Sequence, residues 1–476
     1  MREQNFFRGA GVLAAFLFAV VVNVRGDVSQ VSELTQRTLS IEEFVSLALA
    51  NDAVFEEILI DELKLQYEKG LRMPARDLVA SVKMQHNAYL SVDRNEPDAE
   101  ISLSKLFPYT GTEVSAGYDN TTRFSSSDSA SEFTAQISQP IGQNAFGRSN
   151  RLLDKIIGLE VDVARHQVVE AYEDYLASTL VVYYNWYQAF ENLSIAKSSY
   201  AENLKLLDSM QERQKQHIAR AVDVNKISLQ VLAKKEQLVE AQQEYDDAEN
   251  LIIKAIRYKG NDALVPKDPV LFSDISVSFE KDYAVFQDSS RTWKVLDLLE
   301  RKSGLQVERE ANDLIPSINL LFGYTVQGED AEIKNEEELI FAGISMEWPF
   351  PDQVDRAEHE VALINEKRQG LVTDNTRYRL YTLIKNLTHQ IRREEELVRI
   401  ASEKIELARS IVKDEAENYS FGKITLNDYI SAVNVLDNNR FTKVSHDMQL
   451  RRLLVEWLRI TDQLVTPVTM WPAQIK

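Results

Sequence analysis

The sequence predicts a mainly α-helical fold with a membrane β-barrel, in which long antiparallel helices extend from short amphipathic strands. Three observations lead to this prediction: few helix breakers, two regions of strict apolar–polar alternation, and a repetition of the whole pattern in the second half. The 476 residues include only 16 Gly and 11 Pro, roughly half of the usual share of about 12%. This scarcity favours long uninterrupted helices over a turn-rich all-β fold or a compact α/β enzyme.

The composition also excludes several classes of protein. Hydrophobic residues make up 44% of the chain and charged residues 27%, which fits neither a disordered chain nor a polytopic membrane protein. There is no cysteine, so disulfide scaffolds, thiol nucleophiles, Cys-ligated zinc and a lipid-anchoring cysteine are excluded. The net charge of −20 argues against binding nucleic acid through phosphate neutralisation.

Residues 1–26 have the pattern of a secretory signal peptide. Arg2 and Arg8 precede an apolar run over 9–24. Residues 24–26 then offer small or modest side chains at the positions that signal peptidase reads. An N-terminal membrane anchor stays open as an alternative, because Arg25 lies next to the cleavage site. No later stretch approaches the ~18–20 consecutive apolar residues of a membrane helix. We therefore expect an exported mature chain without such a helix.

The remaining chain is predicted to be an internal duplication, with a first repeat over 27–260 and a second over 261–476. Each repeat has a helix that ends at a proline, then a strand region, then a second proline followed by a long helix pair. The strand regions lie at about 77–140 and about 316–349. Corresponding elements of the two halves are roughly 200 residues apart, which is too long for a solenoid repeat.

Both strand regions alternate with a period of two. Apolar side chains occupy every second position over 78–90, with His86 as the exception, and again over 318–326 and 340–348. Strands of about ten residues with one apolar and one polar face suit a bilayer-spanning barrel with a wet lumen. An ordinary half-exposed antiparallel sheet has the same alternation. Two hairpins per chain cannot close a barrel, so the barrel requires several chains.

One pair of segments in the first repeat has no counterpart in the second. Residues 101–107 and 112–118 have the pattern of an additional hairpin. The duplication gives this hairpin no place in the predicted sheet.

The helical regions carry apolar residues at spacings of three and four, as over 238–255 and 397–412. The second of these regions has two adjacent apolar stripes, so the helix can contact neighbours on both sides, unlike a helix of a dimeric coiled coil. A single helix from 145 to about 214 would be on the order of 100 Å long. Such a length suits an object that spans the periplasm.

With these elements in order, the chain resembles the TolC-like outer membrane efflux protein family. The resemblance runs from Leu39 to about Leu464 and depends on the ordered set of elements, present twice, rather than on one specific motif. It implies a homotrimer with a barrel of strands pooled from three chains above a long antiparallel α-helical barrel. It also implies a location in the cell outer membrane, with most of the chain in the periplasm of a Gram-negative type envelope.

The resemblance further implies a passive channel or exit duct for efflux or secretion. Its partners would be a periplasmic adaptor (membrane fusion) protein, an inner-membrane efflux or ABC transporter, and outer membrane lipid. No cofactor, metal or enzyme activity is expected, because the six histidines form no i,i+4 pair and no phosphate loop or nucleophile motif occurs. The alternative function is a soluble periplasmic coiled-coil adaptor or scaffold protein.

The resemblance places the periplasmic tip at two turns, Gln214–Asp223 and Tyr419–Asp428. Gly422 suits the chain reversal in the second turn, because glycine adopts left-handed conformations at little cost. His217 stands in the corresponding place of the first turn, and Asp223 closes that turn. This departure bears on how the first turn would dock an adaptor.

Tyr419 and Asp428 match positions that hold the family's entrance closed, whereas Ile424 stands at the family's basic position. The resemblance therefore does not extend to an ionic latch of the familiar kind. Three Asp428 side chains around a threefold axis would form an electronegative ring that favours cations. The alternative is that Asp428 caps a helix after Thr425 or pairs with Lys423.

Overall fold

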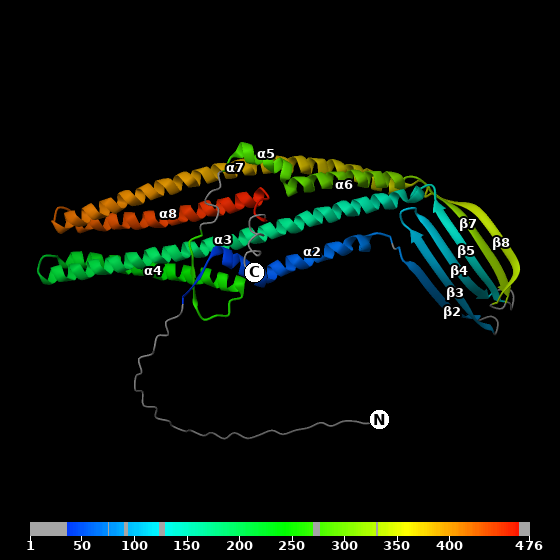
Figure 1. Cartoon of the computed structure of the whole chain (residues 1–476), viewed down its shortest axis with the longest axis horizontal. Coiled ribbons are helices and arrows are strands. Elements are labelled where there is room, and N and C mark those ends of the chain that lie inside the picture. Colours follow the sequence, from blue (N-terminus) through cyan, green and yellow to red (C-terminus); the bar gives the residue numbers. More distant parts are fainter. Residues whose placement is uncertain are drawn as a thin grey trace, which may run out of the picture.

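The computed structural model describes an elongated molecule, with a sheet at one end and helical turns at the other (Figure 1). The described residues are 36–74, 76–89, 94–122, 129–269, 277–329 and 332–465. The predicted signal peptide, residues 1–26, lies outside them. None of the helices in this part of the chain combines the length and the apolar character needed to cross a membrane.

The elements occur in the same order twice. The first series is β1 (Gln36–Leu39), α1 (Ile41–Asn51), α2 (Ala53–Arg72), β2 (Leu78–Tyr89), β3 (Arg94–Phe107), β4 (Thr112–Thr122), β5 (Ser129–Pro140), α3 (Arg148–Lys215) and α4 (Ala221–Ile256). The second series is β6 (Ala263–Pro266), α5 (Phe279–Ser289), α6 (Arg291–Asp313), β7 (Ser317–Glu329), β8 (Glu332–Glu347), α7 (Gln353–Ser420) and α8 (Leu426–Ile460). The first series has four long strands between its helices and the second has two.

The long helices follow the closing prolines, as the sequence predicts. Helices α3 and α7 have 68 residues each, which corresponds to about 100 Å at 1.5 Å per residue. Shorter helices begin at side-chain caps: Ser40 caps α1, Asp52 caps α2 and Ser290 caps α6. Such caps satisfy backbone N–H groups that otherwise have no partner in the first turn.

The long strands form one antiparallel sheet with the order β2-β3-β4-β5-β7-β8. The additional hairpin predicted over 101–107 and 112–118 is confirmed, and with it the sheet has six strands rather than the four of two hairpins. The additional hairpin is β3–β4, and it lies inside the sheet between β2 and β5. It has no counterpart after α6, so the duplication alone could not place it.

The helices form an open layer whose order changes along the molecule. Near the sheet, α2 packs on α3, α3 on α6 and α6 on α7; toward the turns, α4 packs on α3, α3 on α8 and α8 on α7. Helix α7 is therefore one edge of the layer throughout, and α2 and then α4 form the other. The sheet has the matching edges β8 and β2. Two continuous edges thus run from the sheet to the turns.

The main core lies in the middle of the molecule, where β1, β6, α1 and α5 pack against the long helices. Its largest fully buried side chains are Trp186, Trp457, Tyr183, Tyr184, Phe44 and Phe286. The Tyr183 hydroxyl donates to the carbonyl oxygen of Leu39 at 2.7 Å and accepts from the N–H of Lys267 at 3.0 Å. Because each buried aromatic ring contributes roughly 1.5–3 kcal/mol, this core holds the two series of elements together.

Candidate functional site

One face of the sheet is apolar across all six strands. The strand register sets these residues side by side in one row: Ala80, Leu103, Ala116, Ala135, Tyr324 and Ile340. Large side chains of this face remain exposed, including Met84 at 74%, Ile340 at 70% and Ile344 at 70%. A continuous exposed apolar surface of this kind marks an interface with a membrane or another protein.

The opposite face of the sheet is mainly polar. The neighbouring row contains Ser81, Ser102, Gly117, Thr134, Thr325 and Leu339. Hydroxyl pairs connect strands within this row: Ser81 and Ser102 lie 3.0 Å apart, and so do Thr134 and Thr325. The sheet thus has one apolar and one wettable face, as the period-two alternation predicts.

The two predicted tip turns lie at the end of the molecule opposite the sheet (Figure 1). They also lie next to each other, since the Tyr419 hydroxyl is 3.1 Å from the Met210 sulfur. The guanidinium of Arg213 lies 5.4 Å from the centre of the Tyr419 ring. The Tyr429 ring stacks on the Tyr419 ring, with 5.9 Å between their centres. Burial in this cluster raises the pKa of Tyr419. Tyr419 therefore joins the second turn to the end of α3.

His217 and Gly422 adopt the same backbone conformation. The φ angle is 62° at His217 and 70° at Gly422, and both values lie in the left-handed region. A residue with a side chain pays roughly 1–2 kcal/mol for this conformation. The departure at His217 noted in the sequence therefore changes the side chain of the first turn and leaves its backbone geometry like that of the second.

Thr425 is the N-cap of helix α8, and Asp428 completes a capping box with it. Its carboxylate accepts a hydrogen bond from the Thr425 N–H at 3.0 Å, and the Thr425 hydroxyl accepts from the Asp428 N–H at 3.3 Å. Hydrogen bonds from Thr425 lower the pKa of Asp428. Lys423 lies 5.2 Å from the Phe421 ring. The capping role that the sequence allowed for Asp428 is therefore present, and it leaves an ionised, exposed carboxylate at the tip.

Asp223 holds the equivalent place in the first turn through a different partner. Arg220 stands where Thr425 stands in the second turn, and its Nε lies 3.0 Å from Oδ2 of Asp223. The hydrogen bond from Arg220 lowers the pKa of Asp223. The charge of Asp223 is thus matched within its own turn, whereas that of Asp428 is held by neutral donors.

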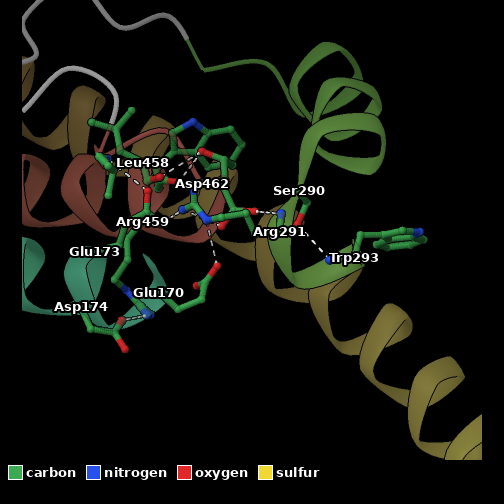
Figure 2. A network of polar contacts seen from close by, with 12 residues as sticks. Glu170, Glu173, Asp174, Ser290, Arg291, Trp293, Leu458, Arg459 and Asp462 are labelled. Atoms are coloured by element: carbon green, nitrogen blue, oxygen red, sulfur yellow. Dashed lines mark hydrogen bonds and ion pairs between the residues drawn. The ribbon is translucent and has the colours of Figure 1, made fainter. Parts of the chain in front are cut away.

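Three carboxylates cluster around Arg291, although they lie far apart in the sequence (Figure 2). The Arg291 Nε lies 3.3 Å from Glu170, its guanidinium contacts Glu173, and its backbone N–H donates to Asp462 at 2.6 Å. The carboxylate oxygens lie within 4.8 Å of one another, a spacing that a metal ion could use. Here the guanidinium already lies among them, so the chain supplies its own cation.

The Arg291 cluster left no signal in the sequence, because its members come from α3, α6 and the segment after α8. Burial raises the pKa of Glu170 to about 7, and the neighbouring Asp462 acts in the same direction. Burial also raises the pKa of Glu173, although the hydrogen bond from Arg291 opposes this shift. Such a network can be recognised only from the fold.

A second buried ion pair joins the two helical hairpins. The Lys234 ammonium of α4 lies 2.8 Å from the Asp437 carboxylate of α8, and their side chains are 8% and 1% exposed. The Ser199 hydroxyl of α3 also donates to Asp437. The sequence reasoning missed this pair too, because Lys234 and Asp437 belong to different halves of the chain.

Comparison with known proteins identifies the fold. No family model matches the sequence, and neither does any curated protein. Solved outer membrane channels do match the structure over 88% of this chain. The channel OprN is 13% identical over 89% of its own chain, with a TM-score of 0.69. The CmeC channel of Campylobacter jejuni is 14% identical over 85%, with a TM-score of 0.66.

The MtrE channel of Neisseria gonorrhoeae, solved in an open state, is 11% identical over 88% of its chain, with a TM-score of 0.62. At this level of identity the likeness concerns the fold. The chain has the fold of TolC-type outer membrane channels, and the resemblance predicted from the sequence is confirmed at the level of the fold.

Proposed function

We propose that the protein is an outer membrane exit duct, formed by three copies of this chain. The observation that carries the proposal is the apolar sheet face joined to helices about 100 Å long. Many of the larger side chains on this face remain exposed. Lipid would cover it, while the polar face would line a water-filled lumen. The likeness to solved outer membrane channels supports this assignment.

The two continuous edges support a closed ring of identical copies. In such a ring, the β8–α7 edge of one copy contacts the β2, α2 and α4 edge of the next, a heterologous contact that closes by rotation. Both edges expose apolar side chains for this contact. On α2 they include Ile60, Leu63, Tyr67 and Leu71, and on α7 they include Val361, Ile364, Leu371 and Tyr378. The number three comes from the family resemblance.

The proposed duct needs partners that deliver its cargo. By the same resemblance, these are a periplasmic adaptor protein and an inner-membrane efflux or ABC transporter, and the two tip turns would meet the adaptor. The duct itself would carry out no catalysis. We also propose that the duplication divides the mature chain between residues 260 and 261, shortly before β6, the first element of the second series.

Fractionation tests the proposed function against the alternative of a soluble periplasmic adaptor. We expect the mature protein in the outer membrane fraction, released only by detergent, because the exposed apolar sheet face would be costly in water. A resident periplasmic protein of the same cells serves as the control for leakage. Release of this protein together with that control, without detergent, would rule out the duct.

We further propose that Asp428 lines the narrow periplasmic end of the duct. Asp428→Asn removes the charge and keeps a side-chain oxygen for the cap on Thr425. In planar bilayers we expect this variant to lose cation preference relative to the original channel, because three carboxylates near one axis attract cations. Asp223→Asn is the matched control in the first turn and should change the preference less. An unchanged preference in Asp428→Asn would remove Asp428 from the aperture.

A further inference from the structure

We infer that the assembled barrel has 18 strands, six from each of three copies, and that it continues the helical tube without narrowing. The inference rests on the proposed three-copy duct and concerns the width of its membrane section. Its starting point is the hairpin β3–β4, which lies inside the sheet rather than at an edge.

The hairpin is built into the fold at both of its sides. Every described residue of β2 pairs with β3, and β4 pairs with β5 from Glu113 to Thr122. The turn between β3 and β4 is held by the start of α3. The Asn150 side chain donates to the Pro108 carbonyl at 3.0 Å, and Arg151 donates to the Tyr109 carbonyl at 2.7 Å.

This turn also requires a close approach of two backbones. A side chain at Gly147, whose φ is 75°, would collide with the carbonyl of Tyr109. Glycine is the residue that allows both the positive φ and the contact. The hairpin is therefore anchored to the start of α3, as expected for a strand pair that belongs to the barrel.

The sheet edges suit closure between copies. Neighbouring strands alternate in direction across the sheet, so its first strand β2 and its last strand β8 run in opposite directions. The β8 edge of one copy can therefore continue the antiparallel pairing onto the β2 edge of the next. Closing the ring in this way removes every free strand edge from the membrane, as a spanning sheet requires.

Six strands per copy suit the width of the helical tube beneath the sheet. Next to the sheet each copy contributes α2, α3, α6 and α7, and four helices at interaxial distances of ~8–10 Å cover about 32–40 Å of the circumference. Six strands at ~4.8 Å, tilted by ~35–45°, cover about 35–41 Å. Four strands would cover only about 23–27 Å. The six-stranded sheet thus matches the helical tube beneath it.

Barrels of 16–18 strands enclose an open aqueous channel. In this duct the polar face of the sheet would line that channel, with Gln136 on β5 near the middle of a strand. The membrane section would then pass bulky, hydrated cargo that the helical tube admits, and size selection would fall to the periplasmic tip.

The test compares the bore of the full chain with that of a chain lacking the hairpin. Deleting Arg94–Thr122 joins residue 93 to residue 123 and leaves β2 connected to β5. Both chains carry Gln136→Cys as their only cysteine, since the natural sequence has none. Intact cells are then treated from outside with maleimide–polyethylene glycol reagents of increasing mass, and labelled protein is detected by its shift on a gel.

We expect the full chain to accept clearly larger reagents than the hairpin deletion, because the barrel circumference falls by about one third with four strands per chain. An equal size limit in both chains would overturn the 18-stranded barrel. Phe133→Cys, on the apolar face, is the matched control and should stay unlabelled in lipid. If Phe133→Cys is labelled as readily as Gln136→Cys, or if neither is labelled, the proposed membrane channel itself fails.

A second measurement uses the full chain and does not depend on folding of the deletion. Ser81 pairs with Ser102 in the sheet, whereas Thr134 is three strands away from Ser81 in the same row. In membranes we expect the double variant S81C/S102C to form an intrachain disulfide under mild oxidation and S81C/T134C to form none. The reverse result would mean that β2 pairs directly with β5 and that the hairpin lies outside the barrel.

Discussion

Replacing Arg291 with leucine is expected to lower the free energy of unfolding by roughly 3–5 kcal/mol near pH 7. The guanidinium is the cation among the carboxylates of Glu170, Glu173 and Asp462, and the side chains of Glu173 and Asp462 are 0% and 3% exposed. Removing it leaves buried negative charges facing one another. Because this cluster ties α6 to α3 and to the end of α8, its loss should loosen the junction between the two halves.

The loss in the Arg291→Leu variant should depend on pH in a defined direction. Burial raises the pKa of Glu170 to about 7 and raises that of Glu173, so their ionisation opposes folding. The stability that protonated Glu170 provides is complete below its ordinary pKa near 4.5 and declines as the pH rises through about 7. Without Arg291 both carboxyls bind protons more readily, so the variant should recover part of its lost stability at pH 5.

Denaturant unfolding of the original and variant chains at pH 5 and pH 7.5 measures both effects. Arg399→Leu is the matched control, because Arg399 also bridges two glutamates but lies exposed on α7. Exposed ion pairs contribute at most about 1 kcal/mol, so this control should change little at either pH. Equal losses in the two variants, or a loss at Arg291 that is the same at both pH values, would contradict the assigned role.

Replacing Asp437 with alanine is expected to cost about 3–5 kcal/mol, because it leaves the Lys234 ammonium buried without its partner. The carboxylate lies 2.8 Å from Lys234, which is 8% exposed, and its other charged neighbour Arg440 lies farther away at 3.5 Å. Since Lys234 belongs to α4 and Asp437 to α8, the helical hairpins should separate more easily toward the tip. Proteolysis within the tip half and denaturant unfolding both report this change.

The double variant K234M/D437L separates the effect of an unpaired charge from that of lost packing. Replacing both partners with apolar residues of similar size removes the charge to be buried, so most of the stability should return. Asp447→Ala is the matched control on the same helix, because Asp447 pairs with Lys443 at a half-exposed site. A double variant as unstable as Asp437→Ala would show that packing around Asp437, and not the charge on Lys234, is what matters.

Much of the fold followed from local patterns in the sequence. The long helices were predictable because breakers are scarce and prolines mark where α3 and α7 begin. The two-faced strands were predictable because side chains alternate across a strand by geometry alone. Pairing between strands far apart in the chain was not predictable in this way, and for that reason the position of the β3–β4 hairpin came only from the structure.

The residues of the candidate site also differ in whether local sequence patterns could predict them. Gly422 could be placed in a tight turn from its residue type, and the Thr425–Asp428 spacing allowed a helix cap, because both are local features. The partners of Arg291 and Lys234 lie on other helices, so no spacing in the sequence identifies them. Asp428 at the aperture and His217 at the docking turn stay predictions, since both depend on neighbouring copies or partners.

The even number of strands has a consequence for how such a protein can change over time. A chain that crosses the sheet an even number of times enters and leaves it at the same end, so α2 and α7 keep their places whether a hairpin is present or absent. A strand pair can then be gained or lost in one step without moving any helix. The girth of the membrane section and the construction of the periplasmic tube can therefore vary independently between related ducts.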